Sequence, residues 1–343
     1  MSFHARILGT AAAAAAVTFV SFGANAADMV LRYSNWLPAG YHLTDQVMKP
    51  WMEDVERVTE GRVKVEILPK VVGTVPGQYD AAADGLADVT LFPVAYAPGR
   101  FPIEDGLELP FVGTDPLKRS LATWDIYKKY MEPLGVFKEV HVVTIFSSNS
   151  THFMTTSKQV KSLADFSGLK MRSPSPTVSQ EIELFGGVAV SKPISELYEL
   201  LSGGIVDGAI IPIDTVKGFK LDGALKYITE VPGGLSNNMV LIAMNPAAWA
   251  KISEKDQKAI DEISGRFLAN RNGEVIGKKL EASYGELKAA GLTFETASPE
   301  FAATLKEKVT PIIEDWYKRA KAAGLENPEA FLKELSDASG GIY

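Results

Sequence analysis

Residues 29–68 read MVLRYSNWLPAGYHLTDQVMKPWMEDVERVTEGRVKVEIL and contain one strand–helix–strand unit. Residues 29–36 alternate between apolar and polar side chains, which is typical of a β-strand, and residues 62–68 alternate in the same way. Between them, residues 45–60 have apolar side chains at helical spacing, and Gly61 ends that helix. A strand, a crossover helix and a second strand in this order predict an α/β fold.

The alternation of strands and helices continues along the chain. Further strands are expected at residues 89–94, 139–146, 169–172, 188–190, 208–213 and 238–244, and helices at residues 78–83, 121–130, 177–185 and 194–201. From Ser253 a helical pattern persists to about Ala290, which is long enough for a helix that spans two lobes. Later helices begin at Ser298-Pro299, with Pro311 expected to kink or restart the chain, and at Asn327-Pro328.

The length of the chain favours two domains, because a single apolar core seldom serves so many residues. The run at 238–244 is expected to return the chain to its first sheet, and the polar stretch at residues 147–151 is a candidate hinge or ligand loop. We therefore expect a first lobe at residues 27–148, to which residues 236–290 add the return segment and the spanning helix. The second lobe is expected at residues 149–235 and the C-terminal helices at residues 291–343.

The first 26 residues predict export. His4 and Arg6 precede an apolar run at residues 7–22, and Ala24-Asn25-Ala26 matches a signal-peptidase site. The run is shorter than the roughly 20 residues that a membrane-spanning helix needs. A cleaved signal peptide and a periplasmic location are expected. Cysteine is absent, so neither disulfides nor thiolate chemistry contribute.

Composition and motifs exclude several function classes. The net charge of −7, without a basic cluster, argues against a nucleic-acid partner. The histidines have no metal-ligand spacing, and no glycine-rich phosphate loop is present, so no metal and no cofactor are expected. Ser167 and Lys170 match the S-x-x-K spacing of serine hydrolases, but no S-D-N or K-T-G element follows. This hydrolase interpretation is the alternative class of function.

Arg172 is the first candidate binding residue. It ends the expected strand at residues 169–172, just before Ser173-Pro174, so its guanidinium is expected at the carboxyl end of a strand, where open α/β sheets bind ligands. From position alone, a surface arginine paired with an acidic neighbour is an equally good interpretation.

The chain resembles the DctP-type substrate-binding subunits of tripartite ATP-independent periplasmic (TRAP) transporters over essentially its whole mature length. The motifs that carry this resemblance occur in order: Ser34-Asn35-Trp36-Leu37-Pro38, Gly61 to Val65, Asp84 to Asp88, Pro98 to Pro102, Leu163 to Arg172, Glu196-Leu197-Tyr198, Gly203 to Gly208, and Trp249 before a long helix. The resemblance implies a two-lobed periplasmic-binding-protein fold, with a hinge and a long helix spanning both lobes.

The resemblance also implies a function. Such proteins are not enzymes; they close over a small organic carboxylate and deliver it to integral membrane subunits. Their carboxylate-binding arginine corresponds to Arg172, and a guanidinium suits this role because its planar fork matches a carboxylate. We expect a monomer.

One position departs from the pattern of the family. Many relatives have an asparagine after the Asp-Gly pair, where this chain has Ile211. Because an isoleucine cannot pair with a ligand hydroxyl, a monocarboxylate with an apolar or aromatic tail is favoured. A C4-dicarboxylate or a sugar acid is the alternative within the family.

The remaining pocket candidates follow from position in the sequence. Each has a structural alternative, such as core packing, turn formation or helix capping. They are Trp36, Tyr96, Phe146, Ser147, Asn149, Ser173 and Asp214. Arg100 would suit a second carboxylate, but its neighbours Pro98, Gly99 and Pro102 favour slightly a structural turn with a local ion pair.

Overall fold

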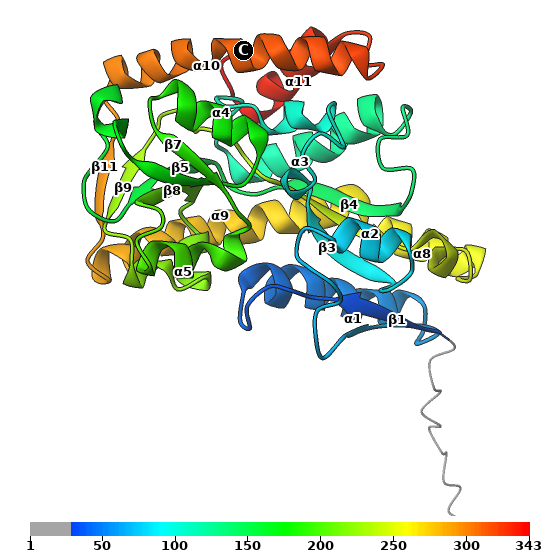
Figure 1. Ribbon diagram of the computed structural model, residues 1–343. Coiled ribbons are helices and arrows are strands. Elements are labelled where there is room, and N and C mark those ends of the chain that lie inside the picture. The colour runs from blue at the N-terminus through cyan, green and yellow to red at the C-terminus, as the bar shows by residue number, and fades with distance from the viewer. Residues whose placement is uncertain (1–28) are drawn as a thin grey trace, which may run out of the picture.

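The computed structural model of the protein describes residues 29–343. The predicted signal peptide at residues 1–26 lies outside this part of the chain. Two β-sheets, each flanked by helices, lie side by side, and a long helix runs past both (Figure 1). The predicted α/β class and two-lobed architecture are confirmed.

The sheet of lobe I has the strand order β2-β1-β3-β10-β4. Strands β1 and β2 are parallel, as the strand–helix–strand pattern predicts, and β10 is the return strand, antiparallel to both of its neighbours. The strands and helices of this lobe are β1 (Met29–Ser34), η1 (Leu43–Met48), α1 (Lys49–Val58), β2 (Val63–Ile67), α2 (Gln78–Ala83), β3 (Val89–Pro93), η2 (Val94–Tyr96), η3 (Glu104–Glu108), α3 (Pro116–Ile126), η4 (Tyr127–Met131), β4 (His141–Ser147), β10 (Met239–Met244) and α7 (Pro246–Trp249).

The sheet of lobe II has the strand order β11-β9-β5-β8-β6-β7. Strand β5 is antiparallel to both of its neighbours, whereas β6 is parallel to β7 and β8. The elements of this lobe are β5 (Thr151–Thr155), η5 (Leu163–Phe166), β6 (Lys170–Ser173), α4 (Pro176–Leu184), β7 (Val188–Ser191), η6 (Ile194–Glu196), α5 (Leu197–Ser202), β8 (Gly208–Pro212), α6 (Thr215–Gly218), η7 (Leu221–Gly223), β9 (Tyr227–Glu230) and β11 (Thr293–Thr296). The chain enters this lobe between β4 and β5, leaves it between β9 and β10, and returns to it at β11.

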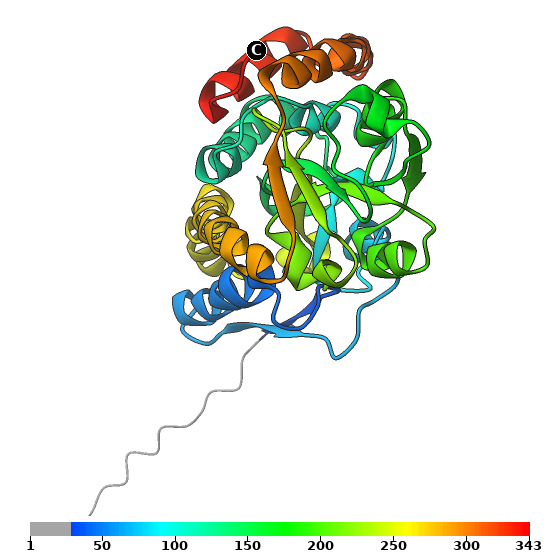
Figure 2. The same cartoon turned by 90° about the vertical axis from the view of Figure 1, so that its left-hand side faces the viewer.

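The long helix α9 (Gly265–Ala289) belongs to the apolar cores of both lobes. Near its start, Leu268 and Ala269 pack in the core of lobe I, and near its end Leu287 packs in the core of lobe II. Figure 2 shows this helix, in yellow to orange, beside both sheets. If the lobes separated from this helix, apolar side chains at one of its ends would be exposed to water, which costs free energy. The helix therefore holds the two lobes in a fixed position relative to each other.

The predicted helix from Ser253 to about Ala290 is instead two helices, α8 (Glu254–Glu262) and α9. Gly265 interrupts them with a φ of 51°, and a Cβ there would lie 2.6 Å from the Trp124 ring. The Trp51 indole also donates to Ser264 Oγ, at 3.0 Å. A glycine that tolerates positive φ and close packing therefore redirects the chain.

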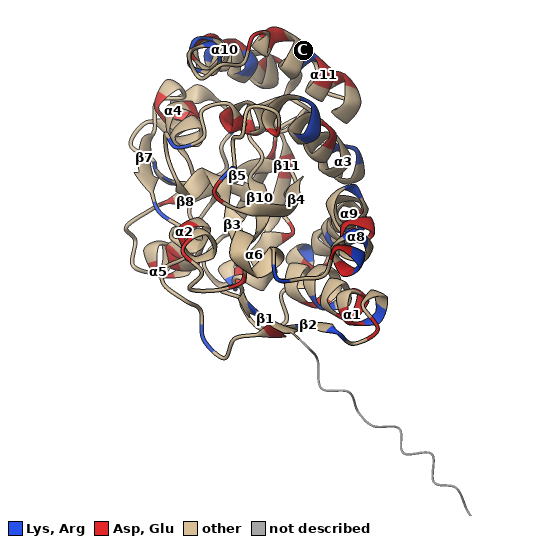
Figure 3. Ribbon diagram, turned by 90° about the vertical axis from the view of Figure 1, so that its right-hand side faces the viewer, with Lys and Arg blue, Asp and Glu red and all other residues tan. Residues whose placement is uncertain are grey.

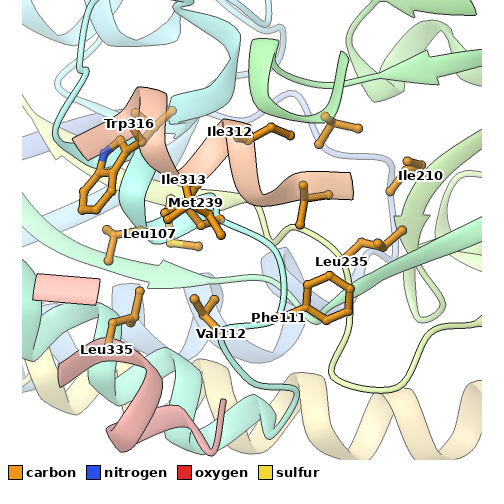
Figure 4. Packing of buried hydrophobic residues seen from close by; sticks show 14 of the residues in the cluster. Leu107, Phe111, Val112, Ile210, Leu235, Met239, Ile312, Ile313, Trp316 and Leu335 are labelled. Carbon is orange, nitrogen blue, oxygen red and sulfur yellow. The ribbon is translucent and has the colours of Figure 1, made fainter. Parts of the chain in front are cut away.

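The C-terminal helices α10 (Pro299–Ala322) and α11 (Pro328–Ser339) complete the largest core cluster. In Figure 4, Ile312, Ile313 and Trp316 of α10 face residues that include Met239 and Leu107 of lobe I. Pro311 lies inside α10 without restarting it. The sequence predicted only helices after residue 290, whereas the structure adds β11, which continues the sheet of lobe II.

Candidate ligand-binding site

Several pockets lie between the lobes, and the one that contains Arg172 is at the carboxyl ends of strands from both sheets. Trp36 follows β1, Tyr96 follows β3, Arg172 is in β6 and Pro212 ends β8. The pocket contains about 530 Å³ of space free of protein atoms, which includes space open to solvent. Strand ends in α/β sheets are the common position for ligand sites.

Arg172 provides a buried positive charge at this pocket, with only 1% of its surface exposed. Its Nε donates to the Lys192 carbonyl at 2.6 Å, and its Nη2 donates to the Tyr96 hydroxyl at 3.1 Å. A guanidinium has five N–H donors, so three remain after these two bonds. Burial lowers the pKa of Arg172, which means that the site disfavours this charge until an anion compensates it.

Tyr96 links the two lobes beside this arginine. Its hydroxyl oxygen accepts from Arg172 Nη2 and, at 2.9 Å, from the Ile194 N–H, both in lobe II. Because both acceptor positions of the oxygen are used, its own hydrogen remains available to donate. Arg172 and Tyr96 together therefore present several donors to one anionic group.

The other walls of the pocket are mainly aromatic and aliphatic. The indole of Trp36 donates to the Leu91 carbonyl at 2.9 Å, so this polar group is satisfied within the wall. Tyr41 and Phe219 meet across the lobes with ring centroids 5.2 Å apart. The remaining apolar lining residues are Leu37, Leu43, Leu91, Pro93, Ile194, Pro212 and Val240. These walls suit a flat apolar body better than a polyhydroxylated one.

Three polar residues complete the lining: Ser148, Thr215 and Asn238. Asn238 was not predicted, and neither were the pocket positions of Tyr41, Leu91, Phe219 and Val240. Asn238 immediately precedes β10, so its place at a strand end was the available signal. The position of Phe219 depends on how α6 of lobe II meets lobe I, which no local pattern encodes.

Of the nine predicted binding residues, Arg172, Trp36 and Tyr96 line the pocket, and the other six are not among its lining residues. Phe146 packs in the lobe I core, and the backbone carbonyl of Ser147 accepts from Asn272 at 3.1 Å. Asn149 donates to the Ile276 carbonyl of α9 at 3.1 Å. Ser173 Oγ donates to the Ser175 carbonyl at 2.7 Å, in the turn before α4.

Ile211 packs in the core of lobe II, whereas its neighbour Pro212 lines the pocket. The side chain of Ile211 is therefore not what makes the pocket apolar. Asp214 is buried against His42 of lobe I, with 3.5 Å between its Oδ2 and the His42 Nε2. Burial raises the pKa of Asp214, and the nearby His42 opposes this shift. The pair is a contact between the lobes next to the pocket.

The structure also places the residues of the alternative interpretations. Ser167 and Lys170 are both exposed, and neither lines the pocket. Arg100 pairs with Asp80 at 2.6 Å and Glu139 at 2.8 Å, as the structural interpretation expects, and is likewise not among the lining residues.

Basic and acidic residues are interspersed over the helices in Figure 3. Within residues 29–343, no group of three or more histidine, aspartate or glutamate residues is arranged to hold a metal ion. No helix in this part of the chain has the length and apolar character to cross a membrane.

A two-lobed α/β fold with an arginine-bearing pocket between the lobes defines the class of solute-binding proteins. The sequence model for bacterial extracellular solute-binding proteins, family 7, matches residues 33–320, and the chain belongs to this DctP family. Members are substrate-binding subunits of TRAP transporters, which bind small organic acids and work with membrane subunits.

Similar proteins have been described in several bacteria. A TRAP periplasmic solute-binding protein from Bordetella bronchiseptica, solved with bound (R)- and (S)-mandelate, is 33% identical, with a TM-score of 0.87 over 91% of this chain and 98% of that one. One from Rhodoferax ferrireducens, solved with copurified benzoate, is 26% identical, with a TM-score of 0.84 over 91% and 97% of the two chains. The outer membrane transporter protein TsaT of Comamonas testosteroni is 28% identical over 96% of both chains.

Proposed function

We propose that this protein is exported to the periplasm, binds an aromatic monocarboxylate, and delivers it unchanged to the membrane subunits of a TRAP transporter. The buried guanidinium of Arg172, with three N–H donors not engaged by the protein, carries the proposal. It faces a pocket whose walls are mainly aromatic and aliphatic. A carboxylate at the arginine and a ring against these walls would satisfy both features.

The relatives support an aromatic ligand. The two solved structures that we describe hold mandelate and benzoate, each with one carboxylate and one aromatic ring. A dicarboxylate would need a second compensating cation, and Arg172 is the only arginine or lysine among the described residues that line the pocket. A sugar acid would place several hydroxyls against Leu91, Phe219 and Val240, which offer them no hydrogen bonds through their side chains.

Binding is coupled to closure of the lobes. The segments at residues 148–150 and 231–238, which connect the sheets, act as the hinge, and the ligand joins Arg172 of lobe II to the aromatic groups of lobe I. The contacts of Tyr96 with Arg172 and of Tyr41 with Phe219 form only when the lobes meet. The membrane subunits then recognise the closed, loaded form.

A thermal-shift screen of organic acids tests this function. Benzoate, phenylacetate and mandelate should raise the unfolding temperature more than succinate or glucuronate. A ligand at about one hundred times its Kd adds about 2.7 kcal/mol of stability, which the screen detects readily. Mass spectrometry should recover the acid unchanged. A larger shift with succinate or glucuronate would contradict the aromatic assignment, and turnover of the acid would contradict the binding role.

A further inference from the structure

A buried pair of titratable side chains joins the two lobes beside the binding pocket. His42 directly precedes η1 of lobe I, and Asp214 directly precedes α6 of lobe II. Their side chains are 7% and 3% exposed, and 3.5 Å separates His42 Nε2 from Asp214 Oδ2. Because the two residues belong to different lobes, separation of the lobes breaks this contact and exposes both groups to water.

The surroundings of His42 oppose a positive charge on its ring. The lysines that line a second cavity between the lobes together with His42 are Lys217, Lys220 and Lys279. Two of them are paired within lobe II and α9, with Asp222 at 2.7 Å and with Glu286 at 2.8 Å. The acidic residue of η1, Asp45, is paired with Lys49 at 2.7 Å. The remaining neighbour is the neutral ring of Tyr41, with its centroid 4.3 Å from that of His42.

Asp214 compensates a charge on His42 only in part. The distance of 3.5 Å between them is longer than the about 2.7 to 2.9 Å of a strong charge-assisted hydrogen bond. Burial and the charge of Lys279 lower the pKa of His42, and this effect outweighs the opposite effect of Asp214. The closed form therefore keeps His42 neutral at pH values at which an exposed histidine is protonated.

We infer that the contact between His42 and Asp214 makes closure, and with it ligand binding, sensitive to pH. In the open form His42 is exposed and takes up a proton as the pH falls through about 6.5. Closure must then release this proton, which costs free energy. The affinity is therefore highest above pH 6.5 and falls as the pH decreases below that value. This inference rests on the proposed function, because closure is measured through binding of an acid.

Calorimetric titration with benzoate and mandelate, at about pH 5.5, 6.5 and 7.5, tests the inference. Both acids remain almost fully ionised in this range, so the ligand itself does not titrate. Complete exclusion of the His42 proton from the closed form would lower the affinity about tenfold between pH 7.5 and 5.5. Burial raises the pKa of Asp214, so proton uptake by this carboxylate on closure offsets part of the loss. We expect a fall of about 3- to 10-fold in the wild type.

Three variants identify the group that titrates. His42→Gln has no ring to protonate, so its affinity should stay within about twofold over the three pH values. Asp214→Asn keeps His42 but removes the compensating carboxylate, so its affinity should fall more steeply than that of the wild type, by about tenfold. His141→Gln is the matched control. Burial also lowers the pKa of His141, to about 4, but this ring stacks on Trp249 within lobe I, so the wild-type dependence should persist.

The outcomes separate this inference from the function on which it rests. A wild-type affinity that is constant within about twofold, or that rises toward pH 5.5, would overturn the inference and leave the binding function standing. A dependence that survives in His42→Gln would also overturn it. If His42→Gln does not fold, Asp214→Asn decides, because a dependence no steeper than that of the wild type contradicts the role of His42. If neither acid binds at any pH, the inference and the proposed function both fail.

Discussion

Replacing Arg172 by alanine should abolish most ligand binding. In the closed site, the carboxylate would lose the one cationic partner that the described lining residues provide and would remain among apolar walls. Two parallel charge-assisted hydrogen bonds at about 1.5 to 3 kcal/mol each amount to about 3 to 6 kcal/mol. Truncation of one member of a buried charge pair costs about 2 to 5 kcal/mol or more. We therefore expect affinity to fall at least about 30-fold.

The effect should be specific to binding. The guanidinium is buried at the pocket, where burial lowers its pKa, so the ligand-free protein gains little from the charge itself. Unfolding of Arg172→Ala without ligand should therefore stay cooperative. Arg172→Lys should fall between the wild type and Arg172→Ala, because an ammonium keeps the charge but not the planar fork.

Arg100→Ala is the matched control. Arg100 is also held by acceptors on its own protein, Asp80 and Glu139, but it is partly exposed and is not among the pocket residues. Calorimetric titration of all variants with the best aromatic acid measures the difference. Binding by Arg172→Ala within about threefold of the wild type, less than about 1 kcal/mol, would refute the carboxylate role of Arg172.

Other perturbations test closure and the buried titratable groups. A Cβ on Gly218 of lobe II would lie 2.5 Å from the Tyr41 ring of lobe I. Gly218→Ala should therefore oppose closure and weaken binding about 5- to 150-fold in calorimetric titration. Gly223→Ala, where the nearest neighbour of the new Cβ is 3.9 Å away, should bind normally in the same titration. Burial raises the pKa of Glu108 from 4.5 to about 8, so the unfolded chain releases this proton at a lower pH than the folded protein does. The free energy of unfolding should therefore fall by up to about 1.4 kcal/mol per pH unit as the pH rises between these two values. Glu108→Gln should flatten this dependence in denaturant unfolding measured at several pH values. Burial lowers the pKa of His152 from 6.5 to about 4. The stability that the neutral His152 contributes should therefore be present above pH 6.5 and disappear as the pH falls toward 4. If His152→Gln lost stability as steeply as the wild type over this range, the denaturation series would contradict this role.

Much of the secondary structure was predictable because the local patterns are strong. The predicted helix at residues 78–83 coincides with α2, and the predicted strands at residues 89–94 and 208–213 each extend at most one residue beyond β3 and β8. The strands β5, β9 and β11 were missed. Sequences such as THFMT and YITE have no clear apolar alternation, and their strand character comes from hydrogen bonds to neighbouring strands.

The candidate site shows where local patterns stop being informative. The position of Arg172 at a strand end follows from its sequence, and it does line the pocket. Successive side chains of a strand point to opposite faces of the sheet. A motif that marks the end of β8 therefore does not show whether Ile211 or Pro212 faces the pocket. The structure places Ile211 in the lobe II core and Pro212 at the pocket.

The order of apolar and polar residues thus specifies the α/β class, most of the strands and helices, and a cation at a strand end, because each depends on neighbours a few residues away. The pocket depends on contacts between residues far apart in the chain. Tyr96 meets Arg172 across 76 positions, and Asn238 pairs with Ser148 across 90. Gly265 divides the long helix because of the Trp124 ring that packs against it. Such contacts depend on how the two lobes pack together, and a short stretch of sequence carries no record of that packing.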